Sequence, residues 1–378
     1  MQSSRALRLA LTLSLLGLIS CSDSDSQPQP PVDFSDGRIL LFVANTGGTN
    51  LSVIDHETRT VVDTIELGGL PHGQIPSSLG DRLYATTEDT GEVFGIDTRT
   101  LEILWRVQAI EEEADELHQP SLTLDNRTLY VPDLFSAQMF VVDVESGTIS
   151  GTVDIIDRTD PNDPMRVLAL HNSYISGDGR HVYVEGILSN RVARVDVETN
   201  EVDRMYVLNG QPRPIALMSD SSRMYVQFTN LEGFVEINLE TGEEVNRIEW
   251  FNTPTDSWTK TLARTKPKSH GIGLNPDQTE LWATSTLADK WYVYSVPELE
   301  QLAVIDIPEG NAPNWIAFTP DGEFAYVSNT TFVPEPNGEP RTDVNGTVTV
   351  INTRTREVVN TIEVGPLPKR VHAVFIPN

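Results

Sequence analysis

A short phrase, in which an aromatic residue is followed by a small apolar residue, recurs along most of the chain and constrains its fold more than any other feature. Thirteen residues after each of the first six aromatic marks stands a short polar residue that opens a turn sequence. Asp and Asn favour such turns because their side chains bond nearby backbone groups. A unit that recurs in this way is a supersecondary element that must stack on copies of itself. The marks are Phe42, Tyr84, Tyr130, Tyr183, Tyr225, Trp282 and Tyr326.

Apolar runs of strand length lie between these marks. Examples are VFGID, MFVVD, VARVD, FVEIN and VTVIN, which alternate with period two and are rich in Val, Ile and Phe. This pattern is typical of β-strands, and the chain contains no convincing long amphipathic helix. Each repeat therefore holds about four short antiparallel strands. Seven such repeats predict an all-β chain that folds as one seven-bladed β-propeller.

The two ends of the chain complement each other. Residues from Ile39 to Leu67 supply three strands but no innermost one, and the C-terminal LPKRVHAVFIPN supplies one inner strand. Closure of a ring removes open sheet edges. We therefore expect residues 38–378 to form the propeller, closed by pairing of the N-terminal strands with the C-terminal strand.

The phrases LYVP, VYVE, AYVSN, SGDGRHVYV and TPDGEFAYVSN resemble YVTN-type β-propeller repeats. The resemblance covers about residues 38–378. It implies a seven-bladed propeller and is nearly silent on activity.

The first 37 residues differ from the rest. Residues 1–20 combine two Arg with a short apolar run, which predicts a signal peptide. Cys21, the single Cys of the chain, follows Leu-Ile-Ser and resembles a bacterial lipobox, which implies cleavage before Cys21 and lipidation of its thiol. Residues 21–37 are rich in Ser, Asp and Pro and predict a flexible tether. We expect an exported cell-envelope lipoprotein, in the outer membrane and facing the periplasm or the cell surface.

The chain is strongly acidic. Its 55 acidic and 27 basic residues give a formal net charge of −28, which does not suit binding to nucleic acid. With one Cys, neither a disulfide nor a Cys-rich metal site can form. We expect a monomer whose partners are the membrane, through Cys21, and a small ligand, metal or protein on one face. That face is the one on which the topology places the longer loops, and loops on a rigid scaffold often carry function.

Histidine recurs at one position of the repeat. His72, His118, His171 and His270 each precede their aromatic mark by twelve residues, and Arg213 and Asn314 hold the same offset. We expect His372 to take the matching place in the closing blade. This position begins the innermost strand, on the face with the long loops, so propeller symmetry predicts a ring of these side chains at the channel mouth.

Two chemistries fit such a ring. Several imidazoles without thiolates suit copper or zinc, which predicts a metal site made by His72, His118, His171, His270 and His372. A subset of three on adjacent blades, His72, His118 and His171, is the alternative if five do not converge. Basic residues on the same face would instead attract an anionic ligand. The ligand-binding candidates are Arg213, Asn314, Lys266, Lys268, Lys369 and Arg370.

The sequence favours a binding or scaffold role over catalysis, and two enzymatic alternatives stay open. Blade two, HQPSLTLDNRTLYVPDL, resembles a segment of the 6-phosphogluconolactonase-like propeller family, which implies hydrolysis of an anionic lactone with His118 and Arg213 at the site. The His ring is similar to the copper-holding ring of the nitrous oxide reductase family, which implies a copper oxidoreductase. The third class of function is non-enzymatic: a rigid interaction platform without any metal.

Overall fold

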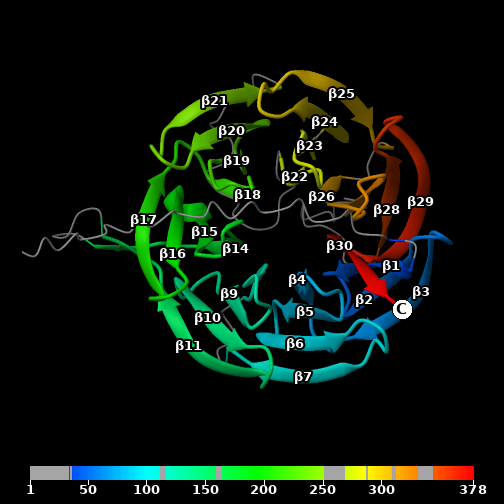
Figure 1. Cartoon of the computed structure of the whole chain (residues 1–378), viewed down its shortest axis with the longest axis horizontal. Coiled ribbons are helices and arrows are strands. Elements are labelled where there is room, and N and C mark those ends of the chain that lie inside the picture. Colours follow the sequence, from blue (N-terminus) through cyan, green and yellow to red (C-terminus); the bar gives the residue numbers. More distant parts are fainter. Residues whose placement is uncertain are drawn as a thin grey trace, which may run out of the picture. The chain divides into compact units, whose positions relative to one another are not determined.

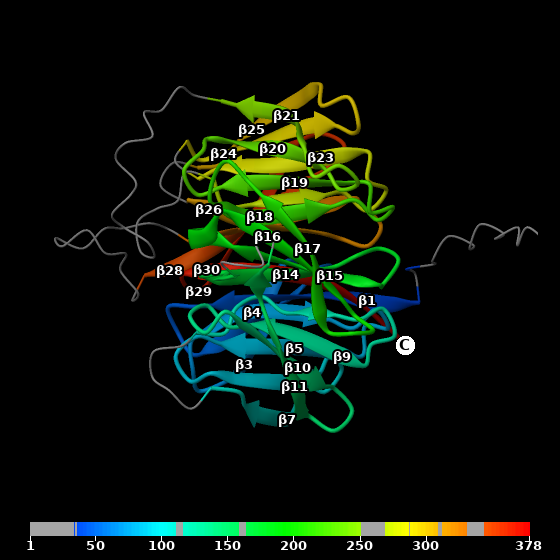
Figure 2. The same cartoon turned by 90° about the vertical axis from the view of Figure 1, so that its left-hand side faces the viewer.

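The computed structural model describes residues 34, 36–110, 116–158, 164–250, 269–286, 288–308, 312–330 and 344–378. Residues Phe34–Asn378 form one compact unit. Within it, seven four-stranded antiparallel sheets are arranged as a ring around a central axis (Figure 1), which confirms the predicted seven-bladed propeller. The turned view of Figure 2 shows the ring from its edge, with the strands running across its thickness.

We number the blades by the chain order of their innermost strands. Blade 1 comprises β4 (Pro71–Pro76), β5 (Arg82–Thr87), β6 (Glu92–Asp97) and β7 (Ile103–Gln108). Blade 2 comprises β8 (Ser121–Leu122), β9 (Thr128–Pro132), β10 (Gln138–Asp143) and β11 (Thr148–Asp154). Blade 3 comprises β14 (Leu170–Ile175), β15 (His181–Gly186), β16 (Arg191–Asp196) and β17 (Glu201–Val207). Blade 4 comprises β18 (Pro212–Leu217), β19 (Arg223–Phe228), β20 (Gly233–Asn238) and β21 (Glu244–Glu249).

The remaining blades follow the same order. Blade 5 comprises β22 (Ile272–Leu274), β23 (Glu280–Ser285), β24 (Lys290–Ser295) and β25 (Gln301–Asp306). Blade 6 comprises β26 (Pro313–Phe318), β27 (Phe324–Asn329), β28 (Asn345–Asn352) and β29 (Glu357–Pro366). Blade 7 comprises β30 (Pro368–Pro377), β1 (Gly37–Asn45), β2 (Asn50–Asp55) and β3 (Thr60–Glu66). A two-stranded ribbon, β12 (Ile156–Asp157) with β13 (Met165–Arg166), and a short 3-10 turn, η1 (Ile187–Ser189), complete the described elements.

Blade 7 closes the ring as predicted. The C-terminal strand β30 pairs with β1 from Gly37 opposite Pro377 to Asn45 opposite Pro368. Figure 1 shows this contact as the red end of the chain lying against the blue one. The closing sheet therefore joins residues from the two ends of the described chain.

The core is divided into seven clusters, and each cluster is shared by two neighbouring blades. The aromatic marks are buried within these clusters. Two of them also reach the next blade: the Tyr130 hydroxyl donates to Asn200 Oδ1 at 2.7 Å, and the Tyr326 hydroxyl lies 2.7 Å from His56 Nδ1. The aromatic recurs because it fills the space between blades and ties one blade to the next.

The predicted polar turns are confirmed. In blade 1, Asp97 Oδ1 accepts hydrogen bonds from the backbone N–H of Arg99 at 2.9 Å and of Thr100 at 3.0 Å. The same side-chain-to-backbone bonds are made by Asp196 in blade 3 and Asn352 in blade 6. These bonds replace backbone ladder partners where the two outer strands of a blade turn.

Several predictions fall outside the described residues. They concern the signal peptide, Cys21, most of the tether, and Lys266 and Lys268, together with most of the long loops. Within the described part of the chain, no helix has the length and apolar content needed to cross a bilayer.

Candidate functional site

One residue near the start of each innermost strand lies at the channel mouth. In blades 1, 3, 4, 6 and 7 the ladder register shifts at this residue, which is therefore left out of regular pairing. Such bulges redirect a side chain. In blades 2 and 5 the equivalent residue precedes the ladder. We call these seven residues the channel ring: His72, His118, His171, Arg213, His270, Asn314 and Lys369.

The prediction that His372 belongs to this ring was wrong. Elsewhere the residue opposite the aromatic mark comes three positions after the ring residue, as Ile75 comes after His72. In blade 7 the mark Phe42 pairs with His372 itself, so Lys369 holds the ring position. His372 lies three residues further along the strand, or about 10 Å at the usual rise. A five-histidine metal sphere is therefore excluded.

Three imidazoles of the ring come together. The ring centroids of His72 and His118 are 4.1 Å apart, those of His118 and His171 are 4.7 Å apart, and those of His72 and His171 are 5.5 Å apart. One nitrogen from each of the three lies within 4.8 Å of the others. His270 stands beside this group, with its centroid 5.8 Å from that of His171. The predicted convergence of His72, His118 and His171 is thus present in the structure.

Close backbone packing brings these blades together. A Cβ atom at Gly73 would lie 2.5 Å from the carbonyl oxygen of His118, so only glycine allows this approach. The Thr86 hydroxyl donates to the same carbonyl oxygen at 3.0 Å and accepts from the Gly73 N–H at 3.0 Å. The backbone of His118 is therefore fixed by blade 1.

The imidazole nitrogens are mostly without partners. Both ring nitrogens of His72 and His118, and Nε2 of His171 and His270, are buried and form no hydrogen bond within the described residues. Nδ1 of His171 lies 3.2 Å from Glu185 Oε1. That contact orients the His171 ring and leaves its Nε2 directed away from Glu185, as an outer carboxylate does in many metal sites.

Burial sets the protonation of the cluster. It lowers the pKa of His118 to about 3 and holds the pKa values of His72, His171 and His270 well below 6.5. Burial likewise raises the pKa of Glu185 to about 8. The four imidazoles are therefore neutral at pH 7, and neutral imidazole is the form that binds metals.

Two further carboxylates border the cluster. Glu88 Oε1 lies 3.6 Å from His72 Nε2, and Glu116 Oε2 lies 3.5 Å from His118 Nε2. Glu116 stands two residues before His118 in the sequence. Asp133, by contrast, accepts a hydrogen bond from the Phe135 N–H at 3.1 Å in its own loop.

Three cations complete the site. Lys369 Nζ pairs with Glu88 Oε1 at 2.9 Å. Arg370 is fully buried, and its Nη2 donates to Asn172 Oδ1 of blade 3 at 2.9 Å, across the channel from blade 7. Its guanidinium also stacks on Trp315, with Cζ 4.0 Å from the ring centroid. Arg213 lies in β18 and makes no hydrogen bond or ion pair with any described residue, and its Nε is buried.

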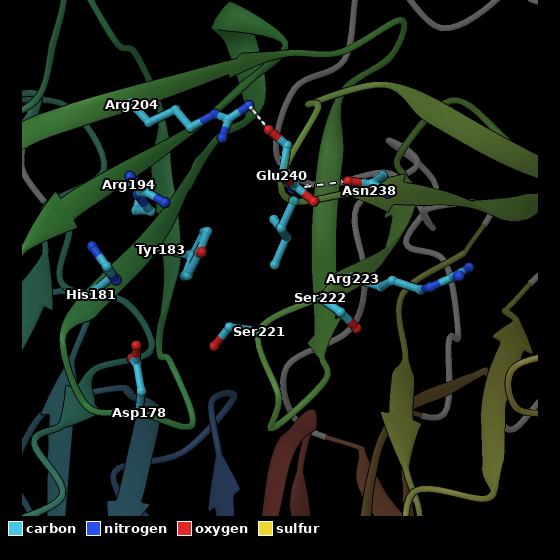
Figure 3. Close-up of a pocket in the computed structure, with 11 residues that line it drawn as sticks. Asp178, His181, Tyr183, Arg194, Arg204, Ser221, Ser222, Arg223, Asn238 and Glu240 are labelled. Carbon is cyan, nitrogen blue, oxygen red and sulfur yellow. Dashed lines mark hydrogen bonds between the residues drawn. The ribbon is translucent and has the colours of Figure 1, made fainter. Parts of the chain in front are cut away.

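A second concave region lies between blades 3 and 4, at the opposite end of the same strands (Figure 3). We call it the blade 3–4 hollow; its cavity volume is about 460 Å³. Arg194 makes two hydrogen bonds of 2.8 Å to Asp203, and Arg204 donates to the Glu240 carbonyl oxygen at 2.7 Å. The lining residues are Asp178, His181, Tyr183, Arg194, Arg204, Ser221, Ser222, Arg223, Asn238, Leu239 and Glu240.

Fold and site together define a seven-bladed propeller with a histidine-rich channel mouth. The family described as outer membrane protein assembly factor BamB matches residues 21–245, more than half of the chain, and the chain belongs to this family. The family described as lactonase, 7-bladed beta-propeller, matches residues 240–330. The second match does not include the blade 2 segment in which the sequence resembled a lactonase.

Curated relatives match about half of the chain. Antigen Lp49 of Leptospira interrogans is 23% identical over 209 residues, which are 50% of this chain and 43% of the antigen. The uncharacterized protein YncE of Salmonella typhi is 26% identical over 189 residues, which are 49% of this chain and 50% of that protein. The chain thus aligns with half or less of the length of either relative.

Solved structures share the fold at low sequence identity. The dihydro-heme d1 dehydrogenase NirN, solved in complex with DHE, superposes with a TM-score of 0.60 at 15% identity, covering 92% of this chain and 77% of that one. The hydrazine synthase of Kuenenia stuttgartiensis superposes with a TM-score of 0.57 at 15% identity, covering 75% of this chain and 76% of that one.

Proposed function

We propose that this protein is an exported, lipid-anchored propeller of YVTN-type repeats that binds one copper or zinc ion through His72, His118 and His171. Its role is binding or scaffolding at the cell envelope. One observation carries the proposal: three buried, neutral imidazoles from consecutive blades present nitrogens within 4.8 Å of one another. Unpartnered polar atoms inside a protein require an explanation, and a shared ligand supplies one.

The donor set fits these metals. Three imidazoles with an open fourth position are typical of zinc sites, and imidazole also suits copper. Glu88, 3.6 Å from His72, and Glu116, 3.5 Å from His118, are the carboxylates that could add a further ligand. Glu185 would act as the outer partner that orients His171.

Metal analysis of protein purified without a histidine tag tests the proposal. We expect one equivalent of copper or zinc per chain after reconstitution, and a loss of at least tenfold in affinity for His118→Ala. His56→Ala is the matched control, because the Nδ1 of His56 lies 2.7 Å from the Tyr326 hydroxyl and His56 is in none of the described His and carboxylate clusters. Absence of both metals from the reconstituted wild type, or equal loss in both variants, would contradict the site.

The anchor is a separate proposal that rests on the Leu-Ile-Ser-Cys sequence ending at Cys21. Membership of a family described by an outer membrane assembly factor supports an envelope location. Cys21→Ser should shift the protein from the membrane fraction to the soluble fraction, since acyl chains supply the membrane affinity. Continued membrane association of the variant would overturn the anchor without affecting the metal site.

Hydrolysis of an anionic lactone is the second candidate, favoured by the lactonase-family match over residues 240–330. Two of the residues on which the blade 2 resemblance rested have structural roles. The Gln119 side chain donates to the Gln74 carbonyl oxygen at 2.5 Å, and Asp133 bonds within its loop. Acid release from 6-phosphogluconolactone that exceeds spontaneous hydrolysis, and that His118→Ala removes, would favour this candidate over a binding role.

A further inference from the structure

The channel ring has two halves of different chemistry. Blades 1 to 3 supply the three clustered imidazoles. Blades 4 to 6 supply Arg213, His270 and Asn314. Arg370 lies between the halves, because it bonds to Asn172 of blade 3 and stacks on Trp315 of blade 6. The second half is rich in hydrogen-bond donors.

Arg213 and Arg370 form no direct ion pair with any described residue, although the carboxyl groups of Glu88 and Glu185 act on both electrostatically. Among the described residues no carboxylate lies within 4.0 Å of the guanidinium of Arg213 or Arg370, and Nε of both is buried without a hydrogen-bond partner. The Arg370 side chain donates only to the Asn172 amide oxygen, at 2.9 Å, and to the Lys369 carbonyl oxygen, at 3.5 Å. Burial lowers the pKa of Arg370 to about 10, and the charge of Arg213 acts in the same direction.

The nearby carboxyl groups are in contact with residues other than these two arginines. Glu185 is fully buried, with its Oε1 3.2 Å from His171 Nδ1, and Glu116 Oε2 lies 3.5 Å from His118 Nε2. Glu88 is already paired with Lys369 at 2.9 Å. Arg370 is fully buried, whereas Arg213 is half-buried and only its Nε is enclosed. A buried charge without a directly bonded counterion is unfavourable, so a bound anion would offset part of the energy of burying these guanidinium groups.

We propose that Arg213 and Arg370 hold a small oxyanion, the carboxylate or phosphate group of a ligand, beside the three histidines. The planar fork of a guanidinium matches two oxygens of such a group. This inference deepens the proposed function, since the same anion would occupy the open side of the metal site. Its arginine contacts do not require the metal.

Calorimetric titration of metal-free and metal-loaded protein with inorganic phosphate and with acetate tests the proposal. We expect one binding event per chain for at least one of the two anions, weakened about tenfold or more in Arg213→Gln. Arg194→Gln in the blade 3–4 hollow is the control and should bind as the wild type does, because Arg194 is already held by Asp203. Preference for phosphate or for acetate distinguishes the two ligand classes.

The outcomes separate this inference from the metal proposal. Anion binding that depends on Arg213 in a protein without metal affinity would support the anion site and overturn the metal site. Normal metal content with neither anion bound, in both metal-free and metal-loaded protein, would overturn the anion site alone. Equal weakening in Arg213→Gln and Arg194→Gln would also overturn it, since the effect would then reflect general surface charge. Circular dichroism of each variant shows that it is folded.

Discussion

The channel ring and the blade 3–4 hollow both contain arginine and histidine side chains, and in blades 3 and 4 they lie at opposite ends of the same strands. They differ in whether their arginines are paired with carboxylates. In the hollow, Arg194 is held by Asp203 through two bonds of 2.8 Å, and Arg223 is paired with Glu236. In the channel, Arg213 and Arg370 form no ion pair within 4.0 Å with any described residue. Six nitrogens of the four ring histidines are also unpartnered within the same residues.

This difference bears on how a binding site is recognised. The hollow has a cavity volume of about 460 Å³, and its arginines are already bonded to acidic side chains or to a backbone carbonyl oxygen. The channel instead buries donors and acceptors that folding alone leaves unsatisfied, which is the usual sign of a functional site. The buried polar atoms without hydrogen-bond partners therefore make the channel, rather than the hollow, the stronger candidate for a binding site.

The largest expected effect comes from removing the strand that carries the charges of the channel. Deletion of residues 367–378 takes away β30, with Lys369 and Arg370, and no residue of the hollow. Loss of the pairing with β1 and of apolar burial on both sides should lower the free energy of unfolding by several kcal/mol, about the burial of a few core side chains. Thermal unfolding followed by circular dichroism measures this, and an unchanged melting temperature would contradict the closure.

Acid should destabilise the channel, and His372 offers a test outside the proposed metal ligands. Burial lowers its pKa to about 3. A histidine with a lowered pKa in the folded state contributes stability that is present above pH 6.5 and is lost as pH falls toward 3, because the unfolded chain takes up the proton first. Between pH 7 and 4 the metal-free wild type should lose about 1–2 kcal/mol more than His372→Gln, after allowance for partial exposure of the side chain.

His181→Gln, on the hollow side, is the control for that comparison. The side chain of His181 is 20% exposed and lies 3.5 Å from Asp203. Urea unfolding at the two pH values gives the required free energies. If His372→Gln and the wild type lose the same stability on acidification, the imidazole of His372 is not held neutral by burial.

The fold was predictable because its signals are local. The aromatic marks and the polar turns recur at fixed spacing, and the structure places them between blades and at the outer turns. The twelve-residue offset likewise located six of the seven ring residues. Counting back from an aromatic mark identifies the ring residue wherever the mark and the innermost strand of its blade are close in the sequence.

The errors arise where a blade or a contact combines residues that lie far apart in the sequence. In blade 7 the mark Phe42 and the inner strand come from opposite ends of the chain, so no count could separate His372 from Lys369. A proline precedes the ring residue in four blades, at Pro71, Pro212, Pro313 and Pro368, and this shared feature was the signal for Lys369. The bond from Arg370 to Asn172 could not be predicted, because it joins blades 7 and 3 across the channel.

Substitution of the buried channel arginine should stabilise the protein. Arg370→Met keeps an apolar chain against Trp315 while removing a charge that forms no ion pair with any described residue. Replacing a buried, poorly compensated charge by an apolar residue of similar length is expected to raise the free energy of unfolding by about 1–2 kcal/mol. Urea unfolding without added anion measures the change. A clear loss of stability would mean that the Arg370–Asn172 bond outweighs the desolvation of the charge.

The matching substitution in the hollow should lower the free energy of unfolding, and by less than any of the changes above. Arg194→Met removes a guanidinium bound to Asp203 by two hydrogen bonds, and the side chains of the pair are 23% and 32% exposed. Because water screens a pair with this exposure, the expected loss is about 0.5–1 kcal/mol. Asp203→Asn and the double variant complete a double-mutant cycle, in which urea unfolding gives the interaction energy between Arg194 and Asp203. A stabilising effect of Arg194→Met would remove the contrast, because it would show that the two arginines are equally poorly compensated.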